Sequence, residues 1–419
     1  MKARNVCIAL MAAGVLAAVS CRQDPIFFII TSETAPQKPR IEGSPTNMVV
    51  FERALPGREA VPVLYVASGR LHWYAKAEGS NTPQWDSNEY KIPQPRGRII
   101  SLAATKDRLY ALCLDGHSAN ATLRYIEPDS DGGDVWKEIG SQAAEYPFIQ
   151  SVYADPETGQ LFAGARRNSK DRATYSILYL DSDDTLKMLK AETAIFSGAV
   201  YRNGVYYLCT RGSGIFRINE ADLVVGANES TLQLADITNI DDKNNDQTII
   251  SMIKLKDEAA TIIAVTRREG YLYKVSEDSI ERMYNNTTKE WISTGWYATG
   301  ALSLWEGGDF KMLIAGIQGG LYSTTTSSYT YGYVEFDLNT DGSFNTDSAS
   351  TRRRPPNLQS APDNDRYTAS LGKHPINHLF QVPVEIDDNK TFFASTQTAG
   401  LWSYKDRPKN GGEQWNAEE

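Results

Sequence analysis

Apolar and polar residues alternate in short runs along most of this chain, and turn-forming residues separate the runs. From about residue 47 onward, the runs are rich in β-branched and aromatic residues, and Gly, Asn or Asp follows most of them. Such alternation is typical of β-strands, because successive side chains of a strand point to opposite faces of the sheet. No stretch in this region shows the apolar period of a helix, so the pattern predicts an all-β fold.

The runs are organised in a repeat of about 50 residues. Each unit has a first apolar run, a second one close behind it and, in most units, a glycine-containing turn with a third run. A period of this length with four strands per unit is typical of a β-propeller blade. The first runs start at Met48, Ile99, Phe148, Ile195, Ile249, Thr299 and Ile376. Residues 47–419 are therefore predicted to form a seven-bladed β-propeller of four-stranded antiparallel blades.

A spacing of 11 residues between a Tyr and a Trp recurs in three of these units. The pairs are Tyr74 with Trp85, Tyr125 with Trp136, and Tyr404 with Trp415. The turn before Trp136 carries Asp131 and Gly133, and it resembles the Asp-box, or bacterial neuraminidase repeat. Asn410 and Gly412 take the same places before Trp415.

The Asp-box resemblance implies a turn between the third and fourth strands of a blade, with the Trp packed between sheets. It implies no activity, because sialidases, sortilin-type receptors and many binding proteins share it. Trp136 is thus expected to be buried. Trp415 is expected in the fourth strand of the last blade, so that the C-terminus completes its own blade.

The first twenty residues have a different pattern. Lys2 and Arg4 precede an unbroken apolar stretch that is too short for a membrane-spanning helix and matches a secretory signal. The stretch ends in Ala18-Val19-Ser20-Cys21 and resembles the bacterial lipobox, as in spirochaete-type envelope lipoproteins. The resemblance implies cleavage before Cys21 and anchoring by palmitate-type acyl chains on that residue. The alternative is a plain signal peptide in which Cys21 occurs by chance.

Residues 21–46 are predicted to form a flexible tether between the lipid and the folded body. Residues 31–46 are rich in Pro, Ser, Thr and charge, and such a composition buries little surface. The apolar segment at residues 26–30 is unusual for a tether. It is interpreted either as an additional strand of the propeller or as a membrane-proximal apolar patch.

A long polar insertion, residues 338–373, separates the last two units. It contains three consecutive basic residues, Arg352 to Arg354, and two prolines. Long loops of this kind are often functional or disordered. The basic triplet fits an anionic partner or lipid headgroups, and a solvated flexible loop is the alternative.

Charge and cysteine content narrow the function class. The chain has 43 Lys and Arg against 52 Asp and Glu, a net charge of −9. Loss of Lys2 and Arg4 with the signal leaves 41 basic residues and a net charge of −11. An acidic body argues against nucleic acid as a partner, because nucleic-acid binding needs a basic surface. Cys113 and Cys209 fall in strand-like runs of different units and are predicted to be buried free thiols.

Three arginines recur at similar places. Arg167, Arg211 and Arg268 each follow a second strand, in the third, fourth and fifth units. Consecutive blades would bring them to one face, where they would form an arc that binds an anionic partner. The alternative is that each is neutralised by a neighbouring carboxylate.

Metal and catalytic motifs are weak. Asp337, Asn339 and Asp341, followed by Gly342, resemble the first half of a calcium loop, although ordinary turns use the same residues. His374 and His378 are four residues apart, but Pro375 prevents the helix that a zinc site of this spacing needs. No nucleophile elbow or phosphate-binding loop is present. We therefore expect no catalytic residues, no metal and no cofactor.

The sequence as a whole predicts a non-catalytic, lipid-anchored propeller of the bacterial envelope that binds another protein or a ligand on one face. Arg22 follows Cys21 where Asp would retain a lipoprotein in the inner membrane, so the resemblance implies the outer membrane, with the body on its periplasmic or surface side. The alternative function is a glycan-acting or small-ligand enzyme that uses the central funnel of the propeller.

Overall fold

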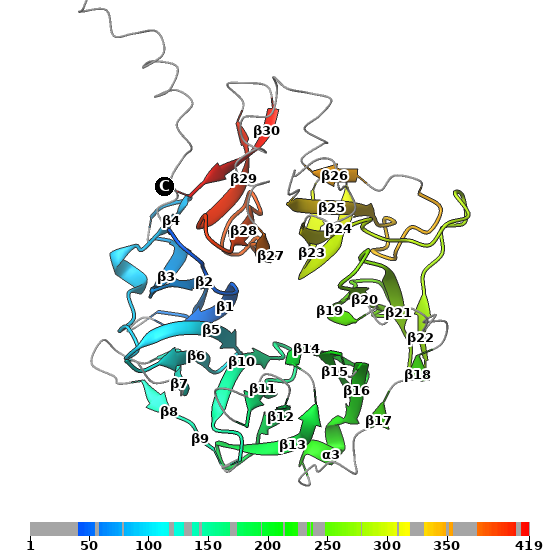
Figure 1. Ribbon diagram of the computed structural model, residues 1–419. Coiled ribbons are helices and arrows are strands. Elements are labelled where there is room, and N and C mark those ends of the chain that lie inside the picture. The colour runs from blue at the N-terminus through cyan, green and yellow to red at the C-terminus, as the bar shows by residue number, and fades with distance from the viewer. Residues whose placement is uncertain are drawn as a thin grey trace, which may run out of the picture. The chain divides into compact units, whose positions relative to one another are not determined.

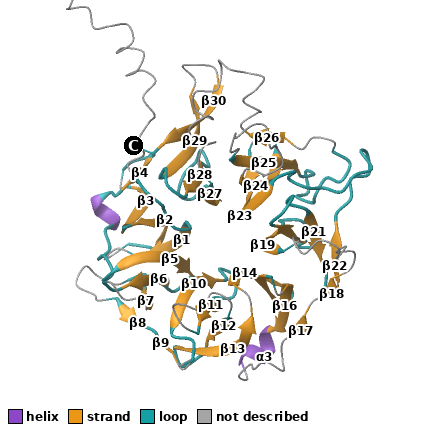
Figure 2. Ribbon diagram, viewed as in Figure 1, coloured by secondary structure: helices purple, strands orange, loops and turns teal. Residues whose placement is uncertain are grey.

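The computed structural model describes residues 41–418 apart from 55–57, 78, 117–120, 130–135, 142–144, 168–173, 194, 213, 225–232, 235, 238–247, 278, 308–309, 319–330, 349–351, 355–374 and 408–411. The predicted signal peptide, Cys21 and residues 26–30 therefore lie outside the described residues, as do Asp131, Gly133 and Asn410. Within the described part, almost all regular structure is β-strand (Figure 2). Among the same residues, no helix is long and apolar enough to cross a bilayer.

The described residues form seven sheets, and each sheet is built from consecutive strands. Sheet 1 contains β1 (Val49–Arg53), β2 (Val61–Ser68), β3 (Arg70–Lys76) and β4 (Pro83–Trp85). Sheet 2 contains β5 (Arg98–Ala104), β6 (Leu109–Leu114), β7 (Ala121–Ile126) and β8 (Lys137–Glu138). Sheet 3 contains β10 (Phe148–Ala154), β11 (Leu161–Arg166), β12 (Tyr175–Leu180) and β13 (Thr185–Thr193), with β9 (Gly140–Ser141) parallel at its edge.

Sheets 4 to 7 repeat the same order. Sheet 4 contains β14 (Ile195–Arg202), β15 (Val205–Arg211), β16 (Gly214–Asn219) and β17 (Gln233–Leu234). Sheet 5 contains β19 (Ile249–Lys254), β20 (Ile262–Thr266), β21 (Leu272–Val275) and β22 (Ser279–Arg282), with β18 (Asp236–Ile237) parallel at its edge. Sheet 6 contains β23 (Tyr297–Glu306), β24 (Lys311–Gln318), β25 (Gly332–Asp337) and β26 (Arg352–Arg354). Sheet 7 contains β27 (Ile376–Gln381), β28 (Phe392–Thr396), β29 (Leu401–Arg407) and β30 (Gly412–Ala417). The described helices are a 3-10 turn, Asn88–Tyr90, and α3, Glu220–Val224.

The seven sheets follow one another around a central opening, with the first strand of each sheet nearest the centre (Figure 1). This arrangement confirms the predicted all-β propeller. Each of the seven predicted first runs overlaps the first strand of one sheet. Trp415 lies in β30, so the chain end completes sheet 7 as predicted.

Hydrophobic contacts join each sheet to the next one. Seven buried clusters each combine residues of two consecutive sheets, and the last cluster packs Val66 and Tyr74 of sheet 1 against Phe393 and Leu401 of sheet 7. The second strands are apolar on both faces because both faces are covered. Successive residues of a second strand therefore pack against different neighbouring sheets, because their side chains point to opposite faces. Within the described residues, these contacts close the ring between sheet 7 and sheet 1.

The Tyr–Trp spacing corresponds to cross-strand pairs. Tyr74 lies opposite Trp85, and Tyr404 lies opposite Trp415, whereas Tyr125 lies opposite Lys137, one residue beyond Trp136. Trp136 is 5% exposed and belongs to the cluster between sheets 1 and 2, and its Nε1–H donates to the Pro93 carbonyl over 2.8 Å. The prediction that Trp136 is buried between sheets is confirmed.

Sheet 6 differs from the sequence-based alignment. The expected third run at residues 319–325 lies outside the described residues, and the third strand is β25, which pairs with β24 from Gly332 onward. The basic triplet of the predicted insertion forms the edge strand β26 rather than a loop.

Residues 41–46, which the sequence assigns to the end of the tether, lie against the folded body. Ile41 is 1% exposed, and its carbonyl accepts a hydrogen bond from the Leu401 amide over 3.0 Å. Cys113 and Cys209 are buried and unbridged, as predicted. Burial raises the pKa of each thiol to about 11, so both stay protonated at neutral pH.

His378 gives the junction of sheets 7 and 1 a pH dependence. Burial lowers the pKa of His378 to about 4, and Nδ1 accepts a hydrogen bond from the Met48 amide over 3.2 Å. Below the ordinary pKa of about 6.5, the unfolded chain binds a proton that the folded chain does not. The free energy of unfolding should therefore fall as the pH drops from about 6.5 to about 4.

We expect His378→Gln to remove on the order of 2–3 kcal/mol of that fall, because Gln offers an acceptor that does not titrate. Urea unfolding at pH 8, 7, 6, 5 and 4 measures the effect. The variant and the wild type should respond equally between pH 8 and pH 7. A wild-type profile that is flat between pH 6.5 and 4, or parallel curves for the two proteins, would contradict the assignment.

Candidate functional site

The strand register identifies three structurally equivalent arginines. In sheets 3, 4 and 5, the first strand has a β-bulge near its start. The residue pair between the first and second strands just before this bulge marks an equivalent position in the three sheets. These pairs are Ile149 with Ala165, Phe196 with Thr210, and Ile249 with Thr266. The next residue on the second strand is Arg166, Arg211 and Arg267, respectively. We refer to these three residues as the arginine rim.

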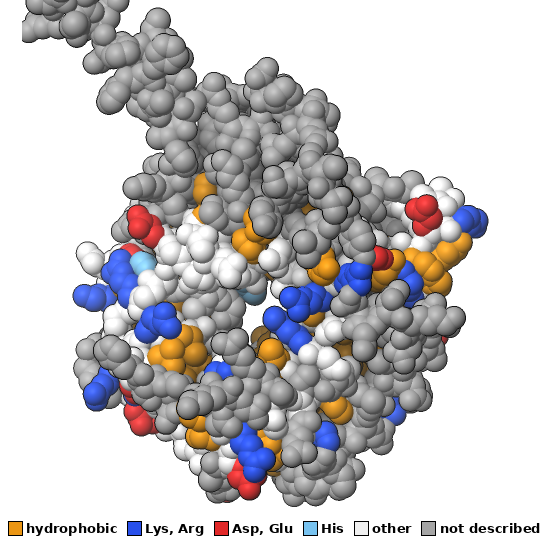
Figure 3. Space-filling view, in the orientation of Figure 1, with side chains coloured by type: hydrophobic (Ala, Val, Ile, Leu, Met, Phe, Trp, Pro, Cys, Tyr) orange, Lys and Arg blue, Asp and Glu red, His pale blue; other side chains and the backbone are white. Residues whose placement is uncertain are grey.

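The arginine rim lies at one end of the ring. Because each sheet has the same strand order, the ends of consecutive second strands share a face. On the face shown in Figure 3, Lys and Arg side chains gather beside the central opening, over β19 and β23. A Cβ added to Gly300, on the first strand of sheet 6, would lie 3.8 Å from Nη2 of Arg211. Arg211 therefore extends from sheet 4 past sheet 5, toward the centre where the first strands converge.

Arg211 and Arg267 are close enough to repel each other. The surrounding protein removes water from the Arg211 guanidinium and lowers its pKa, and the positive charge of Arg267 lowers it further. In the part of the chain that the structure describes, no carboxylate lies within ion-pair distance of Arg166, Arg211 or Arg267. The rim is thus a local group of positive charge whose described surroundings supply no counter-ion.

The three arginines singled out from the sequence fall in two registers. Arg211 belongs to the rim, whereas Arg167 and Arg268 each lie one residue beyond the equivalent position. Arg167 is exposed at the end of β11, and Arg268 is half-buried and has an interaction partner of its own. Sheets 3 and 5 each have two consecutive arginines, so the sequence does not show which of the two is equivalent to Arg211. Alignment on the bulge separates the two members of each pair.

The rim is confined to three sheets. In sheet 2 the equivalent position is Leu114, and the next residue, Asp115, accepts a hydrogen bond from Nη2 of Arg124 over 2.8 Å. This bond holds the pKa of Asp115 below its ordinary value. In sheets 6 and 7 the equivalent residues are Gln318 and Gln397. Of sheets 2 to 7, sheets 3, 4 and 5 therefore contribute positive charge at this position.

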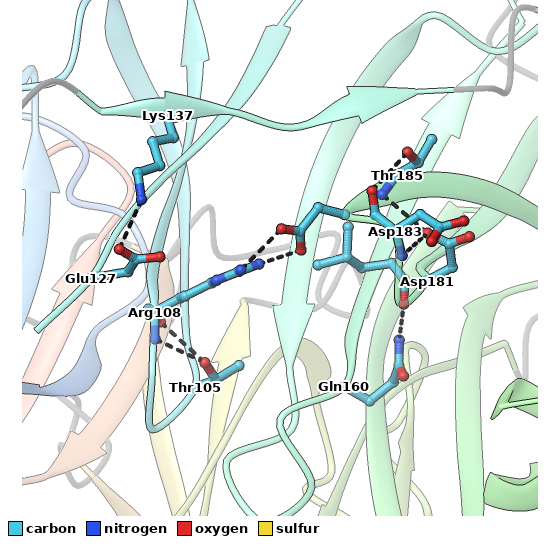
Figure 4. A network of polar contacts seen from close by, with 10 residues as sticks. Thr105, Arg108, Glu127, Lys137, Gln160, Asp181, Asp183 and Thr185 are labelled. Atoms are coloured by element: carbon cyan, nitrogen blue, oxygen red, sulfur yellow. Dashed lines mark hydrogen bonds and ion pairs between the residues drawn. The ribbon is translucent and has the colours of Figure 1, made fainter.

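A polar network between sheets 2 and 3 differs from the arginine rim, because its positive charges are paired with carboxylates (Figure 4). Arg108 donates hydrogen bonds to both carboxylate oxygens of Asp184, at 2.5 and 3.0 Å, and these bonds raise its pKa. Lys137 pairs with Glu127 over 2.8 Å. A cavity of about 640 Å³ lies beside Arg108, but the charges along it neutralise one another. The network is therefore suited to holding two sheets together rather than to binding an ion.

The residues of the predicted calcium loop are engaged in turns. Asp341 Oδ1 accepts hydrogen bonds from the amide and the hydroxyl of Ser343, and Asp337 Oδ2 accepts one from the hydroxyl of Ser348. Asn339 donates through Nδ2 to Oγ of Ser343 over 2.9 Å. Within the described ranges, no group of three or more His, Cys, Asp or Glu side chains is placed to hold a metal.

Comparisons with known proteins return fold neighbours only. No protein-family model matches the chain, and no curated protein matches it either. One similar solved structure is the WD40 β-propeller domain of Doa1, with a TM-score of 0.47 and 10% identity, over 89% of this chain and 97% of that one. Sqt1 of Saccharomyces cerevisiae has a TM-score of 0.47 and 14% identity, over 91% of this chain and 88% of that one.

A bacterial structure is also similar, the extracellular domain of the one-component system BT4673 from B. thetaiotaomicron. Its TM-score is 0.44 and its identity is 12%, over 89% of this chain and 40% of that one. At such identities the likeness concerns the fold alone.

Proposed function

We propose that this chain is a non-catalytic, lipid-anchored protein of the bacterial envelope that binds an anionic partner protein through the arginine rim. The anchor is Cys21, in the lipobox-like stretch that the sequence shares with spirochaete-type lipoproteins. Arg22, in place of Asp, favours the outer membrane. The propeller body then acts as a rigid frame that presents its loops to the partner.

The absence of a carboxylate beside the arginine rim, among the described residues, is the observation that carries this proposal. Two guanidinium groups that repel each other have an electrostatic cost. An anionic partner removes this cost when it binds. The mature chain as a whole is acidic, with a net charge of −11. The rim is therefore a patch of positive charge on an acidic protein, and it would orient an anionic partner.

The alternative function, a glycan-acting or small-ligand enzyme in the central funnel, is not supported by a specific observation. Such an enzyme would need carboxylates or histidines that converge with altered pKa values. The arginine rim supplies positive charge alone. Binding is therefore the function that the arginine rim supports best.

Capture of the partner tests the rim. The full lipoprotein, purified in detergent with an affinity tag, serves as bait for an envelope extract at about 50 mM salt, where ionic contacts are weakly screened. Arg166→Gln/Arg211→Gln/Arg267→Gln should lose the proteins that co-purify with the wild type, while its melting temperature stays close to wild type. The matched control replaces three exposed lysines elsewhere, Lys91, Lys106 and Lys274, with Gln and should retain the partner.

A second bait distinguishes the two arginine registers. Arg167→Gln/Arg268→Gln removes the residues that follow the rim and leaves the rim intact. We expect this bait to retain most of the partner. Equal recovery of the partner by the rim variant and the wild type would reject the rim as the binding site. Loss with the second bait alone would transfer the site to Arg167 and Arg268.

The anchor makes a separate prediction. Cys21→Ser removes the thiol that the lipid needs, so the variant should move from the detergent phase to the aqueous phase in Triton X-114 partitioning. Incorporation of a radiolabelled or alkyne-tagged palmitate should be lost at the same time. A variant that partitions like the wild type would show that Cys21 carries no lipid.

A further inference from the structure

A pocket of about 350 Å³ lies away from the arginine rim, between two loops that are distant in the sequence. One wall is the hairpin after β22, residues 283–296, which Figure 1 shows as the yellow-green loop at the outer edge of the ring. The other wall is the loop after β25, residues 337–348. The pocket therefore lies at the junction of sheets 5 and 6.

Hydrogen bonds hold the two walls together. Asn285 donates through Nδ2 to the Ser348 carbonyl over 2.7 Å, and Asn286 donates through Nδ2 to Oδ1 of Asp347 over 2.9 Å. The hydroxyl of Thr287 donates to the Asp347 carbonyl over 2.7 Å. Because both walls are fixed to each other, the pocket is formed before any ligand arrives, which reduces the entropic cost of binding.

Trp291 lines the pocket and is 45% exposed, which is unusual for such a large apolar side chain. Its ring does not move freely, because the Arg282 guanidinium lies 4.7 Å from the ring centroid and Tyr284 contacts it edge-on at 5.2 Å. Arg282 is itself stacked on Tyr271, at 3.3 Å. Neither Arg282 nor Tyr284 lines the pocket, so the indole has support outside it and remains accessible from within. An exposed but immobilised indole is suited to stacking against a ligand.

The polar groups of the pocket restrict the ligand. Apart from its aromatic and aliphatic residues, the lining consists mainly of amides and hydroxyls, such as Asn345, Ser293 and Thr288. Among the residues that the structure describes, its charged members are Glu290 and Asp337, and no Lys, Arg or His lines it. An anionic ligand would be repelled. A ligand with many hydroxyl groups and no charge would find both acceptors and donors.

We infer that this pocket binds an uncharged saccharide unit, independently of the arginine rim. One face of a pyranose ring presents C–H groups that stack on an indole, and its edge presents hydroxyls that donate to carboxylates and accept from amides. Trp291 supplies the platform, and Glu290 and Asn345 supply hydrogen-bonding groups at its edge. A pocket that combines an aromatic surface with a few polar groups is the usual form of a small-ligand site.

The experiment uses the detergent-solubilised wild-type lipoprotein and an array of uncharged oligosaccharides of glucose, galactose, mannose and N-acetylglucosamine. The strongest binder is then titrated against each protein by isothermal titration calorimetry, a readout that does not depend on Trp291. Trp291→Ala should weaken binding about tenfold or more, and Trp291→Phe, which keeps an aromatic face, should weaken it less. Glu290→Gln retains an acceptor and should change the affinity only a few-fold. The melting temperature of each variant confirms folding.

Each outcome decides the inference. The absence of binding to every oligosaccharide on the array would overturn it, as would equal binding by Trp291→Ala and the wild type. A cationic ligand is the competing chemistry, because carboxylates and an indole also attract an amine. Binding of choline or lysine, lost in Glu290→Gln, in place of saccharide binding would reject the uncharged ligand. The rim variant should bind the saccharide as the wild type does, so failure of the rim proposal leaves this result unaffected.

Discussion

Replacement of Trp136 by Ala is expected to lower the free energy of unfolding by about 3–5 kcal/mol, the usual cost of removing a core aromatic. Trp136 is 5% exposed and packs in the cluster between sheets 1 and 2. The substitution leaves a cavity at this junction and also leaves the Pro93 carbonyl without its indole donor. Urea denaturation followed by far-UV circular dichroism measures the change.

The matched control for Trp136→Ala is the same substitution at Trp291. Trp291 is 45% exposed, so its loss should cost roughly 1 kcal/mol or less, mainly from its contacts with Arg282 and Tyr284. Equal destabilisation by the two substitutions would show that Trp136 does not lie in a sheet junction. An unchanged denaturation midpoint for Trp136→Ala would contradict the assignment of the repeat.

Gly270→Ala is expected to destabilise the chain by about 2–5 kcal/mol, through backbone strain and a steric clash. Gly270 has φ +58°, which an L-residue adopts at a cost. A Cβ there would also lie 2.8 Å from Cβ of Thr294, closer than such atoms approach, and the Thr294 amide is tied to the Gly270 carbonyl over 3.0 Å. The turn between β20 and β21 would have to open, and Arg267 would be displaced with it.

A second glycine separates the two causes of this effect. Gly295 has φ +73°, but nothing lies within 4 Å of a Cβ added to it. Gly295→Ala should therefore cost about 1–2 kcal/mol, from the backbone alone. Gly270→Ala could be found no more destabilising than Gly295→Ala. Thr294 would then move away from the new methyl group at no cost in stability, and the tight packing described for this turn would be wrong.

The strands were predictable because the alternation of apolar and polar residues that marks them is visible within a few neighbouring residues. Two-residue alternation and the repeat of about 50 residues place first and second strands in the sequence, and each predicted first run overlaps an observed strand. Sheet 6 was harder to align, because its third strand begins at Gly332 and its edge strand is the charged β26. Hydrophobic periodicity does not reveal β26, because its three residues are all arginines and so show no apolar alternation.

The candidate sites were less predictable because they depend on register and on distant segments. A bulge in the first strand decides that Arg267, and not Arg268, is equivalent to Arg211, and a bulge leaves no clear mark in the sequence. The pocket beside Trp291 is formed by loops about 50 residues apart in the sequence. The hydrogen bonds from Asn285 and Asn286 that join these loops follow from the fold and not from a motif.

The salt dependence of partner binding tests the central claim, that the arginine rim binds an anionic protein, most directly. The partner captured with the wild-type bait is purified, and its Kd is measured by biolayer interferometry between 50 and 300 mM NaCl. We predict that wild-type affinity weakens about tenfold or more across this range, because the contact depends on charges that salt screens. Arg166→Gln/Arg211→Gln/Arg267→Gln should bind weakly throughout and show little dependence on salt. A wild-type Kd that does not change with salt, or a rim variant with the same Kd and the same salt dependence as the wild type, would contradict the account.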